Sequence, residues 1–172
     1  MSNTILSILN QSINNANVSA LLEELRDKDS KFLLYNPEKQ DVKGPLDKWE
    51  CHAAESMGVT IEILDDVVIS ICIESSFTKV LEFLFIEEEF QTLISTMSRA
   101  AVQNRLGKPL YCTELFDHYL MNDEVVLGVL SWPHLNDEVS TYCFGSKRIF
   151  SDPERIPNRS SFTFDSLYHQ FN

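Results

Sequence analysis

The 172 residues carry a net charge of −12 at pH 7, with 44% hydrophobic and 23% charged residues, a balance typical of one globular domain spanning 1–172. The negative charge argues against binding to nucleic acid or to an anionic membrane, because both require a basic surface. It permits electrostatic steering toward a basic protein partner. The alternative is that the charge serves only to keep the protein dispersed in solution.

The N-terminal sequence MSNTILSILNQSINN has neither the basic start nor the continuous apolar run of a signal peptide. No apolar run approaches the roughly 20 residues that a membrane-spanning helix needs. Four cysteines are far apart in the sequence and include no CxxC pair. We therefore expect a cytoplasmic protein with four reduced thiols, at Cys51, Cys72, Cys112 and Cys143.

Two helices and a strand are expected at the start of the chain. Apolar residues from Ile5 to Ile13 follow a helical period, and SALLEELRDKD places three leucines on one face of a second helix beginning at Ser19. KFLLYN, residues 31–36, is typical of a short strand. The loop over 36–45 is indicated by its proline, glycine and charges.

The segment DKWECHAAESMG has two interpretations. Asp47 is suited to cap a helix that ends at Gly58 in the left-handed conformation. Alternatively, Trp49, Cys51 and Ala53 alternate as they would along a strand. The helix is the favoured interpretation.

Residues 59–86 predict an antiparallel meander of three strands. VTIEIL and VVISICI are β-branched runs joined by Asp65 and Asp66, a pattern typical of a hairpin. KVLEFLFI, residues 79–86, is expected to add the third strand.

EEEFQTLISTMSRAAVQNRLG then changes to a helical period. Apolar residues from Phe90 to Leu106 keep one stripe, and Gly107 ends it. The three glutamates 87–89 occupy the first turn, where the helix dipole favours negative charge. A purely structural role is therefore sufficient to account for them.

The last third of the chain alternates between strands and turns. Residues 110–122 are expected to form a strand or a short helix, and EVVLGVLSW, residues 124–132, a strand. VSTYCFG, residues 139–145, is expected to pair with it across the turn PHLNDE. After a loop with two prolines, SFTFDSLYHQF is expected to close the chain as a short helix.

The expected fold is therefore α+β. It has an antiparallel sheet of about five strands, made of the meander, the long helix and the later hairpin, with N-terminal helices and a short C-terminal helix. Over about residues 59–145 this element order resembles that of type III secretion chaperones, without a shared motif. The resemblance implies a dimeric α/β body that holds an unfolded segment.

No motif predicts catalysis or a bound metal. GxSxG is absent, and the 5 glycines are isolated, so no phosphate-binding loop can be built from them. With four cysteines and four histidines in an acidic chain, triad-like sets and histidine–carboxylate pairs arise by chance. We therefore expect no enzymatic activity, no metal and no cofactor. The sets that resemble triads are Cys112 with His118 and Asp117, and Cys143 with His134 and Asp137.

Acidic residues concentrate in the segments assigned to the sheet. Residues 50–89 hold ten acidic residues and one basic residue, and residues 109–146 hold six acidic residues and no basic one. If these strands share one sheet, their polar residues form a continuous negative field, and a cationic partner would relieve its internal repulsion. The alternative is a solvated face whose charges are screened by salt and have no binding role.

The leading hypothesis is a non-enzymatic binding protein, an immunity protein or inhibitor that occludes the basic active site of a toxin such as a nuclease. Trp132, Tyr142 and Phe150 are candidate aromatic anchors. The alternatives are a secretion-type chaperone, which predicts a homodimer with apolar grooves, and an enzyme with a cysteine–histidine or carboxylate site. The carboxylates expected to contact the partner are Glu62, Asp65, Asp66, Glu74, Glu82, Glu87, Glu88, Glu89, Asp123, Glu124, Asp137 and Glu138.

Overall fold

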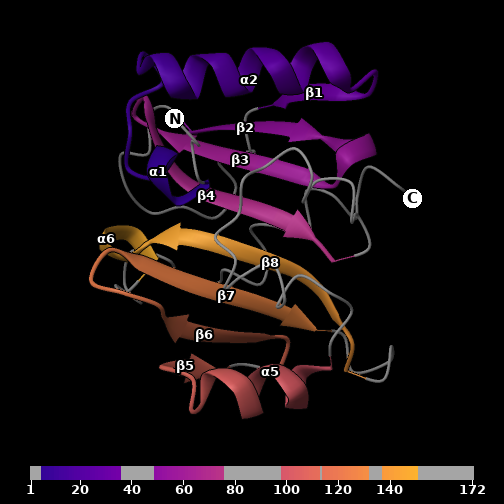
Figure 1. The fold of residues 1–172 in the computed structure, drawn as a ribbon, viewed down its shortest axis with the longest axis vertical. Coiled ribbons are helices and arrows are strands. Elements are labelled where there is room, and N and C mark those ends of the chain that lie inside the picture. The colour runs from indigo at the N-terminus through magenta and orange to yellow at the C-terminus, as the bar shows by residue number, and fades with distance from the viewer. Residues whose placement is uncertain (1–4, 36–48, 76–97, 113, 132–136, 151–172) are drawn as a thin grey trace.

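One antiparallel sheet of eight strands organises the molecule (Figure 1). The computed structural model describes residues 5–35, 49–75, 98–112, 114–131 and 137–150. The strand order is β1-β2-β3-β4-β8-β7-β6-β5, so the expected α+β fold with about five strands and a long helix is wrong. The strands are β1 (Phe32–Tyr35), β2 (Trp49–Ala54), β3 (Val59–Leu64), β4 (Val67–Glu74), β5 (Tyr111–Cys112), β6 (Phe116–Leu120), β7 (Val125–Ser131) and β8 (Val139–Ser146).

The described helices are short, and α2 and α5 flank opposite edges of the sheet (Figure 1). Asn15 and Ser98 cap the starts of α2 and α5, where their side chains accept backbone N–H groups at 2.9 Å and 3.2 Å. No helix of the described residues is both long and apolar enough to cross a lipid bilayer. The helical elements are α1 (Ile5–Ile8), α2 (Ala16–Lys28), the 3₁₀ turn η2 (Glu55–Met57), α5 (Arg99–Leu106) and α6 (Lys147–Phe150).

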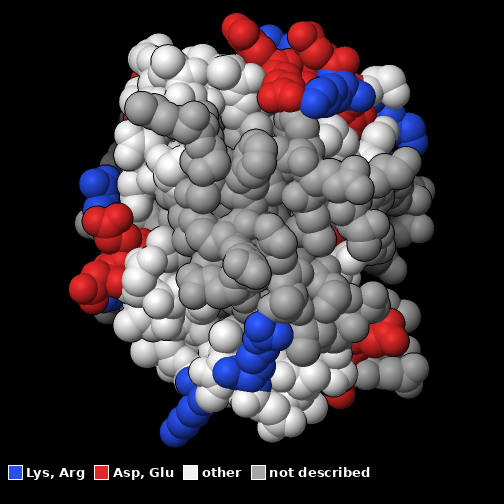
Figure 2. Space-filling model, viewed as in Figure 1, with Lys and Arg blue, Asp and Glu red and all other residues white. Residues whose placement is uncertain are grey.

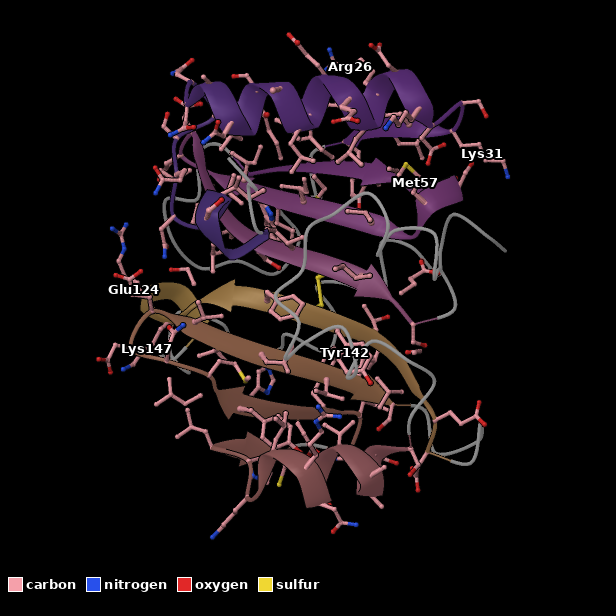
Figure 3. The ribbon with its side chains drawn as sticks, in the orientation of Figure 1. Arg26, Lys31, Met57, Glu124, Tyr142 and Lys147 are labelled. Carbon is pink, nitrogen blue, oxygen red and sulfur yellow. A yellow bond between two sulfur atoms is a disulfide. The ribbon has the colours of Figure 1, made fainter. Side chains whose placement is uncertain are left out.

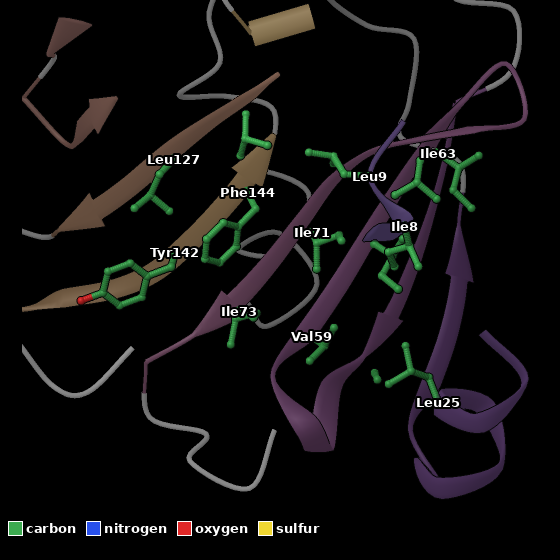
Figure 4. Packing of buried hydrophobic residues seen from close by; sticks show 14 of the residues in the cluster. Ile8, Leu9, Leu25, Val59, Ile63, Ile71, Ile73, Leu127, Tyr142 and Phe144 are labelled. Atoms are coloured by element: carbon green, nitrogen blue, oxygen red, sulfur yellow. The ribbon is translucent and has the colours of Figure 1, made fainter. Parts of the chain in front are cut away.

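Alternating residues of the central strands form the core (Figure 4). Ile61 of β3, Ile71 of β4 and Phe144 of β8 are fully buried on the same face of the sheet. Helix α2 packs Leu22 and Leu25 into the same cluster. Full burial of each such side chain contributes about 1.5–3 kcal/mol relative to exposure.

The opposite face of the sheet is buried as well. All seven residues of β7 are buried, and so are Glu62, Ser70 and Thr141 on the side away from the core cluster. The alternation of apolar and polar residues in β3 therefore does not mark a solvated face. The near-continuous apolar run of β7 is the sequence signal that indicates burial on both sides.

Two predicted hairpins are confirmed. Strands β3 and β4 pair with Leu64 opposite Val67, and Asp65 and Asp66 form the turn with φ values of 49° and 62°. Positive φ at both turn residues suits the twist of the adjoining strands. Strands β7 and β8 also pair antiparallel, as predicted.

The helix favoured from Asp47 to Gly58 is wrong. The strand β2 occupies this segment and pairs with both β1 and β3, so two neighbouring strands satisfy its backbone groups. Gly58 does adopt the left-handed conformation, with φ of 63°, but it follows only the three-residue turn η2.

The long helix expected through Leu106 is also wrong. Ser98 is extended, with φ of −73° and ψ of 154°, and α5 begins only after it. Between residues 110 and 122 the chain forms two strands, β5 and β6. The expected strand over 79–86, the helical turn at 87–89 and the C-terminal helix lie outside the described residues.

Strands β4 and β8 join the two halves of the described sheet, β1–β4 and β5–β8. Cys72 and Cys143 lie directly opposite each other in this pairing, with Cα atoms 4.0 Å apart, and form a disulfide (Figure 3). The expectation of reduced thiols is therefore wrong for this pair. Cys51, which is buried, and Cys112, which is exposed, are free thiols.

Candidate functional site

Four carboxylates gather where β4 ends and β8 begins. We call Glu55, Glu74, Asp137 and Glu138 the acidic end. Glu74 donates its backbone N–H to the carbonyl of Gly58 at 2.9 Å, and this bond brings the η2 turn, with Glu55, against the last residue of β4.

The backbone also fixes the other side of the acidic end. Ser75 donates its N–H to the Ser140 carbonyl at 2.8 Å and its hydroxyl to the Val139 carbonyl at 2.6 Å. The two acidic residues just before Val139 are held by Arg99, whose N–H donates to the Asp137 carbonyl at 2.8 Å. The acidic end is thus built from η2, β4 and the start of β8.

Glu55 and Glu74 lie close enough for their charges to repel each other. Partial removal from water, and then the negative charge of Glu55, raise the pKa of the Glu74 carboxyl above its ordinary value. Glu74, Asp137 and Glu138 are exposed, and Glu55 is half-buried. The sequence reasoning missed Glu55 because it placed this residue inside a helix.

A second acidic group lies at the opposite end of the sheet. Asp65 and Asp66 form the β3–β4 turn, while Asp123 and Glu124 precede β7. Lys147 follows β8 at this end and donates its backbone N–H to the Glu124 carbonyl at 2.8 Å (Figure 3). Ser146 pairs with Val125, which directly follows Glu124. Lys147 and Arg148 directly follow Ser146, so they place positive charge beside this acidic group.

The described acidic residues form separate groups on the face shown in Figure 2, rather than one continuous field. They lie at the margins of that face, and lysine or arginine residues accompany the groups at its upper and left margins. A partner that recognises this charge would therefore contact one group rather than the whole sheet.

Two residues expected at the interface are buried instead. Glu62 is 4% exposed and lies opposite Cys51 in the β2–β3 pairing. Burial, and then the charge of Glu62, raise the pKa of the Cys51 thiol. Tyr142 has no exposed surface and belongs to the core cluster, so it cannot anchor a partner.

The remaining expected contact residues lie outside the described part of the chain. Glu82, the glutamates 87–89 and Trp132 fall in the ranges that the structure does not describe, and so does the side chain of Phe150. In the sequence, residues 76–97 continue directly from Ser75, and Trp132 directly follows Ser131, the last residue of β7. Both segments are therefore attached at the acidic end of the sheet.

Asp117 is the centre of a polar network among the described side chains. Arg99 donates to both carboxylate oxygens, from Nε at 2.9 Å and from Nη2 at 2.6 Å. Gln103 donates at 2.8 Å, and the Tyr119 hydroxyl donates at 3.4 Å. The network binds α5 to β6 across the core cluster.

Hydrogen bonding decides the ionisation of Asp117. Burial alone would raise its pKa, but the bonds from Arg99 and Gln103 outweigh it, and the pKa lies below its ordinary value. Burial and the charge of Asp117 raise the pKa of Tyr119 to about 12. Asp117 is therefore a stable anion whose acceptor positions are taken, which suits a structural role rather than proton transfer.

The two triads drawn from the sequence do not form. Asp117 and His118 are consecutive residues of β6 and point to opposite faces of the sheet, so they cannot both meet Cys112. Cys143 is bonded to Cys72, and His134 lies outside the described residues. The described residues contain no group of three or more histidine, cysteine or acidic side chains arranged to hold a metal ion.

Comparison with known proteins gives no match to a family model, to a curated protein or to a solved structure.

Proposed function

We propose that this chain is a non-enzymatic binding protein that docks on a basic protein through its acidic end, as an immunity protein occludes the active site of a toxin. The proximity of Glu55 to Glu74, two carboxylates that repel each other at the end of β4, is the observation that carries the proposal. A cationic side chain placed there would offset the repulsion between Glu74 and Glu55. The net charge of −12 supports the same polarity of partner, because it steers basic proteins toward the chain.

The acidic end is favoured over the opposite end of the sheet for two reasons. Lys147 and Arg148 are placed beside the Asp123–Glu124 group and reduce its attraction for a basic partner. In the sequence, by contrast, segment 76–97, with four further glutamates, follows directly on Ser75, and Trp132, an aromatic residue of the kind that dominates interface energetics, follows directly on Ser131.

The test compares two variants of equal charge. One neutralises the acidic end (Glu55→Gln, Glu74→Gln, Asp137→Asn, Glu138→Gln), and the other neutralises the opposite end (Asp65→Asn, Asp66→Asn, Asp123→Asn, Glu124→Gln). Each changes the net charge from −12 to −8. Asparagine is suited to the positive φ of Asp65, Asp66 and Asp137, so neither variant strains these turns.

Immobilised wild-type chain is first incubated with extract of its source at about 50 mM salt and washed at about 500 mM, which screens exposed charges. Proteins released by salt are identified, purified and assayed for nuclease or other toxic activity with and without the chain. We expect the acidic-end variant to bind the purified partner about tenfold more weakly, since four ion pairs at the surface contribute about 0.3–0.5 kcal/mol each. The opposite-end variant is expected to bind within about twofold of wild type.

Equal weakening by both variants would mean that net charge, not the acidic end, determines binding. A partner whose activity is unaffected by the chain would reject the inhibitor class, and a stable homodimer that holds an unfolded segment would favour the chaperone alternative. Substitution of Cys112 by serine should leave inhibition unchanged, whereas an enzyme that used this thiol would lose its activity.

A further inference from the structure

A row of sulfur and imidazole groups crosses the middle of the sheet on the face away from the core cluster. His118 of β6 lies opposite Gly128 of β7, Gly128 lies opposite Cys143 of β8, and Cys143 lies opposite Cys72 of β4. Residues in one row across adjacent antiparallel strands point to the same face. The imidazole, the glycine and the disulfide are thus neighbours although the sequence separates them widely.

Gly128 leaves room for the imidazole beside the disulfide. A Cβ atom at this position would lie 3.6 Å from His118 Nε2 and 3.7 Å from Cys143 Cβ, so both side chains border the same spot above the glycine. A side chain that extends beyond Cβ would occupy the space between the imidazole and the cysteine. His118, Cys72 and Cys143 are 7%, 6% and 7% exposed, so exchange with an external disulfide takes place when this part of the sheet opens locally.

The position of the cysteines in the ladder brings their sulfur atoms together. Ser75 and Ser140 form a hydrogen-bonded pair, because Ser75 donates its N–H to the Ser140 carbonyl. Hydrogen-bonded and non-hydrogen-bonded pairs alternate along an antiparallel ladder, so Cys72 and Cys143, three positions earlier along β4, form a non-hydrogen-bonded pair. Side chains of such pairs approach more closely than those of hydrogen-bonded pairs. The bond also closes the junction between the two halves of the sheet, across a sequence separation of 71 residues.

We propose that Cys72, Cys143 and His118 form a redox site, in which a reversible disulfide locks the β4–β8 junction and the imidazole serves as the base for thiol exchange. This inference does not depend on the proposed partner. It concerns the stability of the sheet and applies whether or not the acidic end binds a protein.

The exchange is balanced with an external disulfide such as oxidised glutathione as the oxidant. The Cys143 thiol gives its proton to His118, and the thiolate attacks the external disulfide, forms a mixed disulfide and releases one glutathione thiolate, which takes up the proton. The Cys72 sulfur then attacks Cys143 Sγ, and the second glutathione leaves with the Cys72 proton. Two protein thiols are oxidised, and one external disulfide is reduced to two thiols.

The bonding pattern is tested on the purified full chain. The protein is equilibrated with reduced or oxidised glutathione, quenched with acid, unfolded and alkylated with iodoacetamide, and then mapped by peptide mass spectrometry. After oxidised glutathione we expect alkylation at Cys51 and Cys112 and a linked Cys72–Cys143 peptide. After reduced glutathione all four cysteines should be alkylated. Alkylation of Cys72 and Cys143 under both conditions would overturn the proposal.

The role of His118 is tested by the rate of bond formation. In a His118→Gln variant we expect re-formation of the bond with oxidised glutathione to slow about tenfold or more at pH 7, as for loss of a general base. The wild-type rate should also fall as the imidazole becomes protonated, a pH dependence that the variant should lack. The fraction of chains that carry the Cys72–Cys143 disulfide at equilibrium should not change. A matched control is His52→Gln, since His52 is a buried histidine on the other face of the sheet.

An unchanged rate and pH profile in His118→Gln would refute the role of the His118 imidazole as the base. Should that variant fail to fold, the pH profile of the wild-type rate decides the point: a rate that keeps rising with the thiolate fraction alone, without levelling off once the imidazole is neutral, would refute the role of His118 as the base.

Discussion

Replacement of Asp117 by alanine removes the acceptor at the centre of the network that fastens α5 to β6. The carboxylate is fully buried, whereas the Arg99 side chain is 18% exposed. The substitution leaves Arg99 and Gln103 without their shared acceptor, and breaking a buried pair costs about 3–5 kcal/mol. Arg99 keeps its bond to the Glu114 carbonyl at 2.6 Å and gains some water, so we expect a loss near the lower limit, about 3 kcal/mol.

In a chain of this length such a loss lowers the melting temperature by about 6–12 °C, which thermal unfolding followed by circular dichroism will measure. Glu24→Ala is the control, because it breaks an ion pair with Lys28 in which both side chains are about half exposed. Exposed pairs of this kind contribute about 0.3–0.5 kcal/mol, so the control should shift the melting temperature by no more than about 2 °C.

Acidity supplies a second test with a defined sign. Because the folded pKa of Asp117 lies below its unfolded value of about 3.9, its stabilisation is fully present above that value and is lost as the pH falls through the folded pKa. The difference in unfolding free energy between wild type and Asp117→Ala should therefore be constant near pH 7 and shrink below about pH 4. If Asp117→Ala lowers the free energy of unfolding by less than about 1 kcal/mol at pH 7, or if its difference from wild type grows as the pH falls, the network does not stabilise the fold as described.

Three further substitutions test how side-chain hydrogen bonds and backbone conformation contribute to stability. Asp29→Ala should cost about 2 kcal/mol in urea unfolding, because this buried carboxylate accepts the backbone N–H groups of Lys31 at 2.7 Å and Met57 at 3.2 Å; a loss under about 0.5 kcal/mol would contradict this account. Gly107→Ala should lower the free energy of unfolding by about 1 kcal/mol, because the backbone φ of Gly107 is +82°. Gly128→Ala should be tolerated within about 1 kcal/mol, because a Cβ there makes only ordinary contacts. A lower melting temperature for Gly128→Ala than for Gly107→Ala would show that backbone conformation does not decide the effect.

Local patterns predicted the hairpins because the necessary information lies within a few residues. The β3–β4 turn depends on two aspartates between β-branched runs, and Asp65 and Asp66 adopt the positive φ values that such a turn requires. The run VVLGVLS likewise has the composition of a buried strand, and it forms β7.

Segments whose structure depends on distant partners were predicted wrongly. Between Asp47 and Gly58 the helical and extended patterns are equally good locally, and pairing with β1 and β3 decides for the strand. The burial of Glu62 on a face that its alternation marks as solvated depends on contacts that no window of β3 contains. The opposition of Cys72 and Cys143 depends on strand register across 71 residues. The acidic end was only partly identified for the same reason, since Glu55 joins it through the position of η2.

The β4–β8 junction also has a consequence for synthesis on the ribosome. Strands β1 to β4 pair with sequence neighbours, so they can assemble as soon as they emerge, but the outer edge of β4 stays unpaired until β8 has been made. That edge belongs to the apolar strand VVISICIE, and unpaired apolar edges recruit other chains. During translation the nascent chain therefore exposes an unpaired apolar edge strand. Agents that slow translation of the C-terminal half should promote aggregation of the nascent chain.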